Sequence, residues 1–98
     1  MKVKINYDYN QQKLMGKSEE FEVKENTTLG EFIKIVDSQI LSKGIEKNIK
    51  VKDLTILREN GTLNSCVVMV NGQSPEGKLE YLLQDGDCID LMYSFCGG

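Results

Sequence analysis

The last sixteen residues read LQDGDCIDLMYSFCGG (residues 83–98), and this stretch decides the fold. Apolar and polar positions alternate along it, which is the period-two pattern of a half-buried β-strand. The apolar face consists of Ile89, Leu91, Tyr93 and Phe95, and the other face of Cys88, Asp90, Met92 and Ser94. Asp85-Gly86-Asp87 predicts the turn that leads into this strand. The strand runs almost to Gly97-Gly98, so the chain is expected to close with a core strand and a short tail.

The segment before this turn predicts another strand. Residues 66–70 are all apolar, as expected for a strand covered on both faces, and Asn71-Gly72 is a strong turn signal. Beyond Pro75, three leucines predict a short helical turn: Leu79, Leu82 and Leu83. Further back, residues 54–58 also read as a strand, whereas residues 45–53 carry no clear pattern.

An amphipathic helix is predicted over residues 29–42. Thr28 is followed three residues later by Glu31, which is the capping box of a helix N-terminus. The apolar positions after it recur at helical spacing: Leu29, Phe32, Ile33, Val36 and Ile40. Gly44 is expected to end the helix, because glycine adopts the backbone angles of a helix C-terminus easily.

The chain opens with a predicted β-hairpin. Residues 2–9 alternate, with Val3, Ile5, Tyr7 and Tyr9 on one face, and residues 18–24 alternate again, with Phe21 and Val23 inward. Residues 10–17 are mostly polar and predict the connecting loop. The order of strand, strand, helix and further strands predicts an α+β fold, the ubiquitin-like β-grasp, with one main helix across a mixed sheet. We expect one domain over residues 1–98, with residues 94–98 as a flexible tail.

The composition excludes several classes of function. The chain has 98 residues, no histidine, a net charge of −3 and a sequence pI of about 4.9. Without histidine there is no Ser-His or Cys-His pair and no histidine metal site, so we expect no enzyme and no cofactor. The acidic balance disfavours nucleic acid as a partner. No apolar run is long enough for a membrane span or a secretion signal, and the three widely spaced cysteines suit a reducing compartment, so a cytoplasmic location is expected.

The terminal Gly97-Gly98 indicates carrier chemistry. Two residues without side chains can enter a narrow channel in a partner, and five extended residues reach about 15 Å. A carboxylate is a poor electrophile, but joining Gly98 to AMP would make a mixed anhydride that a sulfur nucleophile can attack. The partner would supply the catalysis and this chain the carbonyl group. Chance or a frayed end is the alternative interpretation of the dipeptide.

The chain resembles the MoaD/ThiS family of ubiquitin-like sulfur carriers. The resemblance rests on the valine-rich segment 67–72 that ends in Val-Asn-Gly, on the Leu-x-Asp-Gly-Asp turn at 83–87, and on a closing strand that ends in Gly-Gly. It implies that an E1-like, ATP-dependent enzyme adenylates Gly98 and that a thiocarboxylate forms there. The sulfur would pass to a biosynthetic enzyme, of molybdopterin or thiamine type in this family. The extra residues around 45–65 differ from the thiamine type.

Several residues near the tail are candidates for contact with partners. Gly97 and Cys96 would thread into the activating enzyme, and Phe95, Tyr93 and Asp87 would dock against it. Each has an alternative: Phe95 can pack on its own sheet, and Cys96 can be incidental. Asp87 can serve turn chemistry together with Asp85 and Asp90.

Two other functions stay open at this point. A ubiquitin-like modifier would form the same adenylate but join Gly98 to lysines of other proteins. A β-grasp interaction module would not need the diglycine at all. Removing Gly98 separates the last of these from the two carrier functions.

Overall fold

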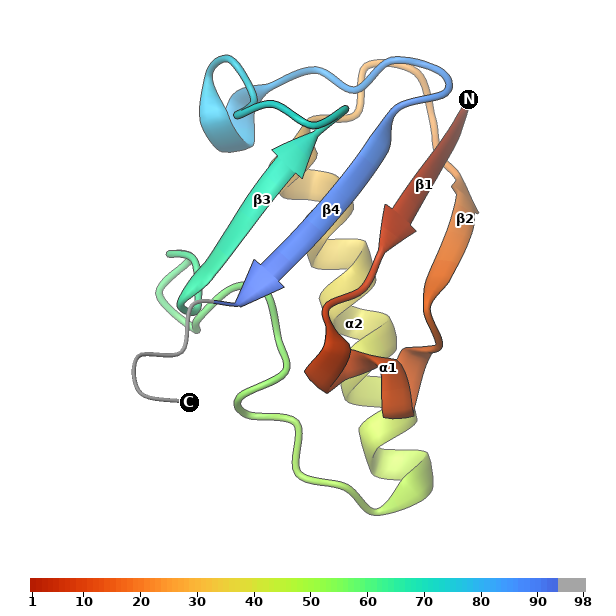
Figure 1. Cartoon of the computed structure of the whole chain (residues 1–98), viewed down its shortest axis with the longest axis vertical. Helices are drawn as coiled ribbons and strands as arrows, with labels where there is room; N and C mark the ends of the chain where they lie inside the picture. Colours follow the sequence, from red (N-terminus) through yellow and green to blue (C-terminus); the bar gives the residue numbers. More distant parts are fainter. Residues whose placement is uncertain (94–98) are drawn as a thin grey trace.

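The fold is a four-stranded mixed sheet with one long helix across one face (Figure 1). The computed structural model describes residues 1–93. The sheet order is β2-β1-β4-β3. In chain order the elements are β1 (Lys2–Asn6), α1 (Tyr9–Met15), β2 (Ser18–Glu22), α2 (Leu29–Lys47), β3 (Cys66–Val70), the 3₁₀ turn η1 (Lys78–Glu80) and β4 (Cys88–Tyr93). This is the β-grasp arrangement that the sequence predicts.

The strand that leads into the tail lies inside the sheet. β4 pairs in parallel with β1, where Ile5 faces Ile89, and antiparallel with β3, where Val68 faces Leu91. Because β1 and β4 run in the same direction, both end on the side of the sheet where α1 begins (Figure 1). A strand paired on both sides has its backbone fixed by two ladders of hydrogen bonds.

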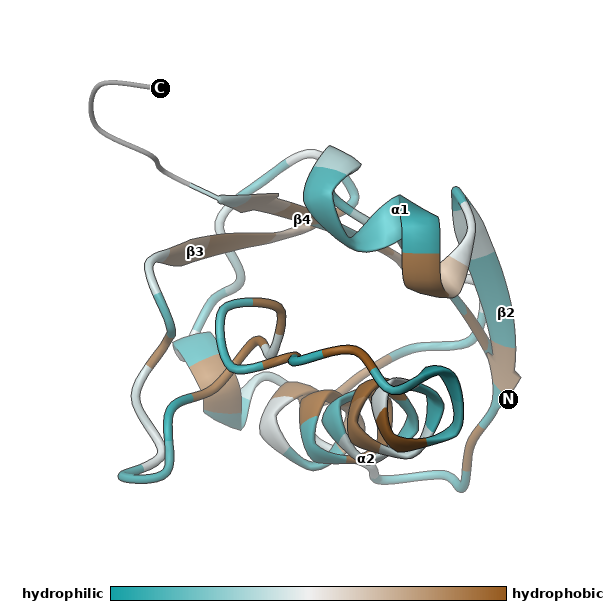
Figure 2. Ribbon diagram, turned by 90° about the horizontal axis from the view of Figure 1, so that it is seen from below, coloured by the Kyte–Doolittle hydropathy of each residue, from teal (hydrophilic) through white to brown (hydrophobic). Residues whose placement is uncertain are grey.

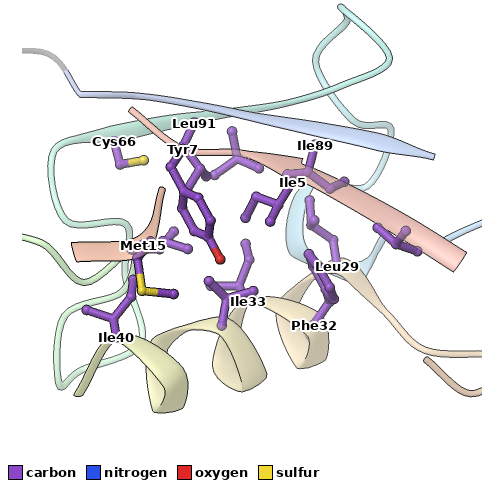
Figure 3. Close-up of a cluster of buried hydrophobic side chains, with 14 of the residues drawn as sticks. Ile5, Tyr7, Met15, Leu29, Phe32, Ile33, Ile40, Cys66, Ile89 and Leu91 are labelled. Carbon is purple, nitrogen blue, oxygen red and sulfur yellow. The ribbon is translucent and has the colours of Figure 1, made fainter. Parts of the chain in front are cut away.

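The core lies between the sheet and α2. Figure 2 shows α2 end-on beneath the strands, with its hydrophobic side turned toward them. In Figure 3, Ile5 and Ile89 of the sheet approach Ile33 and Phe32 of α2. Thr28 caps α2 as predicted, because its side chain accepts from the Glu31 N–H and Glu31 accepts from the Thr28 N–H. The helix stripe is fully buried: Leu29, Phe32, Ile33, Val36 and Ile40.

The predicted loop over residues 10–17 is wrong, because most of it is the helix α1. Asp8 caps this helix and Gln11 completes a capping box, which the sequence analysis did not identify. Leu14 and Met15 are buried in the core, so the helix is held by packing as well as by its cap. Consequently β1 ends at Asn6, and Tyr9 is 80% exposed rather than facing the core.

Gly44 does not end the long helix. α2 continues to Lys47, and its C-cap is Asn48, which adopts the left-handed conformation at φ 55°. Gly44 is a buried interior residue of the helix instead. Residues 49–51 fold back against it, and the Ile49 N–H donates to the Gly44 carbonyl at 2.8 Å.

Two further predictions about the second half of the chain are wrong. Residues 54–58 form no strand, and only a single bridge joins Leu57 to Leu63. β3 is an edge strand with one open face, because Val67 is 45% exposed while its neighbours Cys66 and Val68 are buried. The predicted turns at Asn71-Gly72 and before β4 are present, and the predicted helical turn is reduced to η1. Within residues 1–93, no helix has the length and apolar character of a membrane span.

Candidate functional site at the end of β4

The site is the point at which β4 ends and the five predicted tail residues follow. Tyr93 is the last residue of this strand. Its hydroxyl lies 2.9 Å from the carbonyl oxygen of Leu54 and 2.7 Å from that of Thr55, so its hydrogen can be shared between them. The buried Gln11 donates to the same hydroxyl at 3.0 Å. Tyr93 thus anchors the strand end to the body of the protein.

The environment of Tyr93 raises the pKa of its hydroxyl. Burial, followed by the nearby Cys66, Asp37 and Asp8, raises the pKa of the Tyr93 hydroxyl far above its ordinary value. The phenol is therefore neutral at physiological pH and can donate to the two carbonyl groups. The docking role predicted for Tyr93 stays a prediction, and the geometry gives the side chain an inward, structural contact.

The other predicted tail residues lie beyond the described part of the chain. Phe95, Cys96, Gly97 and Gly98 fall in residues 94–98, outside the residues that the structure describes. Their predicted roles in docking, threading and attachment therefore stay predictions. What the structure adds is the position of Tyr93, from which these residues follow.

Asp87 organises the turn before β4. It is 5% exposed, and its carboxylate accepts from Asn71 Nδ2 at 2.9 Å, from the Tyr81 hydroxyl at 3.0 Å and from the Gln84 N–H at 2.8 Å. The Tyr81 hydroxyl has its pKa raised, by desolvation first and then by Asp87. These contacts match the turn chemistry that the sequence also allowed. Docking of a partner on Asp87 stays a prediction.

The other two aspartates of this region also have partners within the chain. Asp85 accepts from the Lys2 N–H at 2.7 Å, and Asp90 accepts from Asn6 Nδ2 at 2.7 Å. The three carboxylates thus hold the turn and β4 against β1 and β3. They form no shared acid–base pair in the geometry described.

An apolar strip lies on the open face of the sheet beside the end of β4. Val67 and Met92 are opposite each other in the β3–β4 register, and they are 45% and 48% exposed. Met69, on the same face of β3, is half-buried. We call Val67, Met69 and Met92 the outer strip. In Figure 2, α2 lies on one side of β3 and β4, and the strip residues alternate with the buried Cys66 and Val68, so the strip faces away from the helix.

The cysteines within residues 1–93 do not form a reactive pair. Cys66 points into the core, as Figure 3 shows, and burial raises the pKa of its thiol to about 12. Cys88 is half-buried, and its sulfur accepts from Asn6 Nδ2 at 3.3 Å. No cluster of three or more metal-ligating side chains occurs within residues 1–93.

A further feature is a hollow beside α2. It is an open groove of about 1010 Å³ between α2 and residues 52–61, lined by residues that include Lys34, Asp37, Leu41 and Arg58. Asp37 holds one wall of it, because its carboxylate accepts from the Ile56 N–H at 2.7 Å and from the Leu57 N–H at 2.9 Å. Burial raises the pKa of Asp37. The groove has no catalytic constellation.

Comparison with known proteins identifies the family. The model of the ThiS family matches residues 3–98, which is nearly the whole chain and includes the diglycine. The chain belongs to the ThiS family. ThiS and MoaD relatives are small carrier proteins rather than catalysts. No curated protein sequence matches the chain.

Solved structures share the fold of this ThiS-family protein at low sequence identity. SAMP1 from Haloferax volcanii has a TM-score of 0.75 and 15% identity, with both chains covered at 100%. A chain of the BexX/CysO complex from Amycolatopsis orientalis has a TM-score of 0.63 and 23% identity, with coverage of 98% and 99%. A chain of the complex of subunits 1 and 2 of molybdopterin-converting factor from Helicobacter pylori has a TM-score of 0.55 and 18% identity, with both chains fully covered.

The solved structures confirm the ubiquitin-like β-grasp, and the family match confirms the predicted MoaD/ThiS resemblance. Asp8 and Gln11, which contact Tyr93, were not predicted from the sequence. The signal was present, because an aspartate followed three residues later by glutamine is a capping-box pattern. It was hidden in a polar stretch that resembled a loop.

Proposed function

We propose that this protein is a sulfur carrier that works through the carboxylate of Gly98. The observation that carries the proposal is the ThiS-family match through residue 98, combined with a central strand that ends five residues before Gly98. A carrier must present its terminus far enough from its body to enter a partner's active site. A central strand, firmly anchored at Tyr93, is a rigid base for such a terminus.

The chemistry begins with adenylation of the terminus. The Gly98 carboxylate attacks the α-phosphorus of ATP in an E1-like enzyme, and pyrophosphate leaves. A hydrosulfide-equivalent nucleophile then attacks the carbonyl carbon, and AMP leaves with the bonding electrons of the mixed anhydride. The product is a thiocarboxylate, which a biosynthetic enzyme of molybdopterin or thiamine type uses as sulfur donor. Gly97 has no side chain and suits the narrow part of the partner's channel.

The outer strip supplies the docking surface in this proposal. Exposed apolar side chains that form a contiguous patch next to a functional terminus favour contact with an apolar surface of the partner. Val67 and Met92 would bury most of their exposed area there, and Phe95 would extend the contact toward the tail. Tyr93 and Asp87 would act from within the fold, the first at the end of β4 and the second at its start.

A protein-modifier function is the second candidate. SAMP1, whose fold is similar, is named a small archaeal modifier protein. A modifier uses the same adenylate, but an amine of a lysine attacks the carbonyl carbon in place of sulfur. The two functions therefore differ in the last nucleophile, and the test must identify the product.

The test is mass spectrometry of the protein purified from its native source under reducing, non-alkylating conditions. A C-terminal peptide that carries one sulfur in place of oxygen supports the carrier. Gly98 joined to lysines of other proteins supports the modifier instead. The control is the chain without Gly98, which should melt at the same temperature and form no adenylate. An intact terminus that stays a carboxylate after incubation with the E1-like enzyme, ATP and sulfide would refute the proposal.

A further inference from the structure

The buried amide of Gln11 joins three parts of the chain at the end of β4. Its side chain is fully buried, and its Nε2 donates to the Leu54 carbonyl at 2.7 Å and to the Tyr93 hydroxyl at 3.0 Å. Its Oε1 accepts from the Asp8 N–H at 3.1 Å. Both N–H hydrogens and the carbonyl oxygen thus have partners. A buried amide that is fully paired has one favoured orientation, because any other would leave polar groups unsatisfied.

Asp8 provides a second attachment for the same strand end. Its Oδ1 accepts from the Tyr93 N–H at 3.2 Å, while Oδ2 accepts from the Asn10 N–H at 3.3 Å. Tyr93 is therefore held at its main chain by the N-cap of α1 and at its hydroxyl by Gln11. Hydrogen bonds at both the main-chain N–H and the hydroxyl fix the orientation of Tyr93, whereas a single hydrogen bond would allow it to rotate.

The attachments reach the long helix as well. Tyr93 and Gln11 both contact the Leu54 carbonyl. Two residues after Leu54, the backbone N–H of Ile56 donates to the Asp37 carboxylate of α2. The end of β4 is thus connected to α1 directly and to α2 through residues 54–57. These are rigid, packed elements, so the position of Tyr93 is set by the fold as a whole.

We propose that Gln11, together with Asp8, is a positioning residue that aims the C-terminal residues at the partner's active site. This inference rests on the proposed carrier function. Tyr93 is the last described residue before the C-terminal residues, so a shift of Tyr93 moves the point at which they begin. A displacement of about 1 Å at a reacting centre can lower a rate by about two orders of magnitude. The helix α1 and its N-cap therefore hold Tyr93 in place, directly before the tail.

The first measurement is hydrogen exchange at the Tyr93 amide in Gln11→Leu. Gln11→Leu removes the acceptor of the Asp8 N–H, and so weakens the hold on Asp8, whose carboxylate accepts from the Tyr93 N–H. We expect that amide to exchange about tenfold faster or more, since each lost hydrogen bond contributes about a factor of five to ten in the opening equilibrium. The matched control is Gln12→Leu, on the same helix, whose amide donates to the Tyr7 carbonyl at 3.1 Å. Exchange at Tyr93 should be unchanged in that variant.

The second measurement is ATP–pyrophosphate exchange with an E1-like enzyme from the same organism. We expect kcat to fall about tenfold in Gln11→Leu with KM within twofold of wild type, because the outer strip still docks while the tail is misdirected. A purely structural role would not lower kcat at constant KM in a variant that stays folded. If Gln11→Leu does not fold, Tyr93→Phe removes the hydroxyl while keeping the ring and is tested in the same way.

Unchanged hydrogen exchange at the Tyr93 amide in Gln11→Leu would refute the positioning role of Gln11. A kcat in Gln11→Leu equal to that of Gln12→Leu would refute it as well. If the wild-type protein forms no adenylate at all, the proposed function fails. In that case the exchange measurement alone decides whether Gln11 fixes the end of β4, so the two failures are distinguishable.

Discussion

Replacement of Gly44 by alanine should destabilise the protein, although the same change stabilises most helices. In an open helix, alanine gains about 1 kcal/mol over glycine. Here a Cβ on residue 44 would collide with Val51 Cγ1 and would lie 3.1 Å from the Ile49 carbonyl oxygen. The chain around Ile49 cannot move away freely, because its N–H donates to the Gly44 carbonyl. Overpacking of this kind costs about 2 to 3 kcal/mol, so the net loss is about 1 to 2 kcal/mol.

Thermal and urea denaturation followed by circular dichroism measure this loss. For a domain of this size, about 1 to 2 kcal/mol lowers Tm by about 4 to 16 °C. The control is Ser42→Ala, at an exposed position of the same helix, which should be neutral or raise Tm by a few degrees. If Gly44→Ala melts at or above the wild-type temperature, the packing of residues 49–51 against α2 is wrong.

Two further predictions concern the core. Phe32→Ala should lower the free energy of unfolding by about 3 to 5 kcal/mol, because Phe32 is fully buried and its ring meets Phe21 edge-to-face at 5.3 Å; an unchanged urea midpoint would contradict this. Stability should also fall as pH rises from about 9 to 12, because the pKa of Cys66 is raised to about 12 from an ordinary value of 9.0. The unfolded thiol loses its proton first, so alkaline pH favours the unfolded state. The urea midpoint measured against pH should show a smaller decline in Cys66→Ala, and an identical decline would count against burial of the thiol.

The sequence predicted the elements that depend on local chemistry. The capping box of Thr28 and Glu31 and the apolar stripe behind it fixed the start and the buried face of α2. The alternation around Ile89 and Leu91 fixed β4, and the turn signals before it were correct. Each of these patterns spans a few neighbouring residues, so each can be recognised without knowing what lies across the fold. The diglycine and its proposed chemistry also come from the sequence, and their roles stay predictions.

Tertiary structure decided the features that depend on distant partners. The sequence predicted that Gly44 ends the helix. In the folded chain, Val51 occupies the space that a side chain at residue 44 would need, and no local pattern places Val51 there. Residues 66–70 are all apolar, yet Val67 lies on the face of the sheet away from the core and is exposed. The alternation places Tyr93 on the apolar face with Ile89 and Leu91, but it does not show which groups the hydroxyl meets. Its contacts with residues 39 and 82 positions away in sequence, at Leu54 and Gln11, turn it inward. Contacts over such separations leave no local pattern, because the geometry that creates them exists only once the sheet, α1 and α2 have packed together.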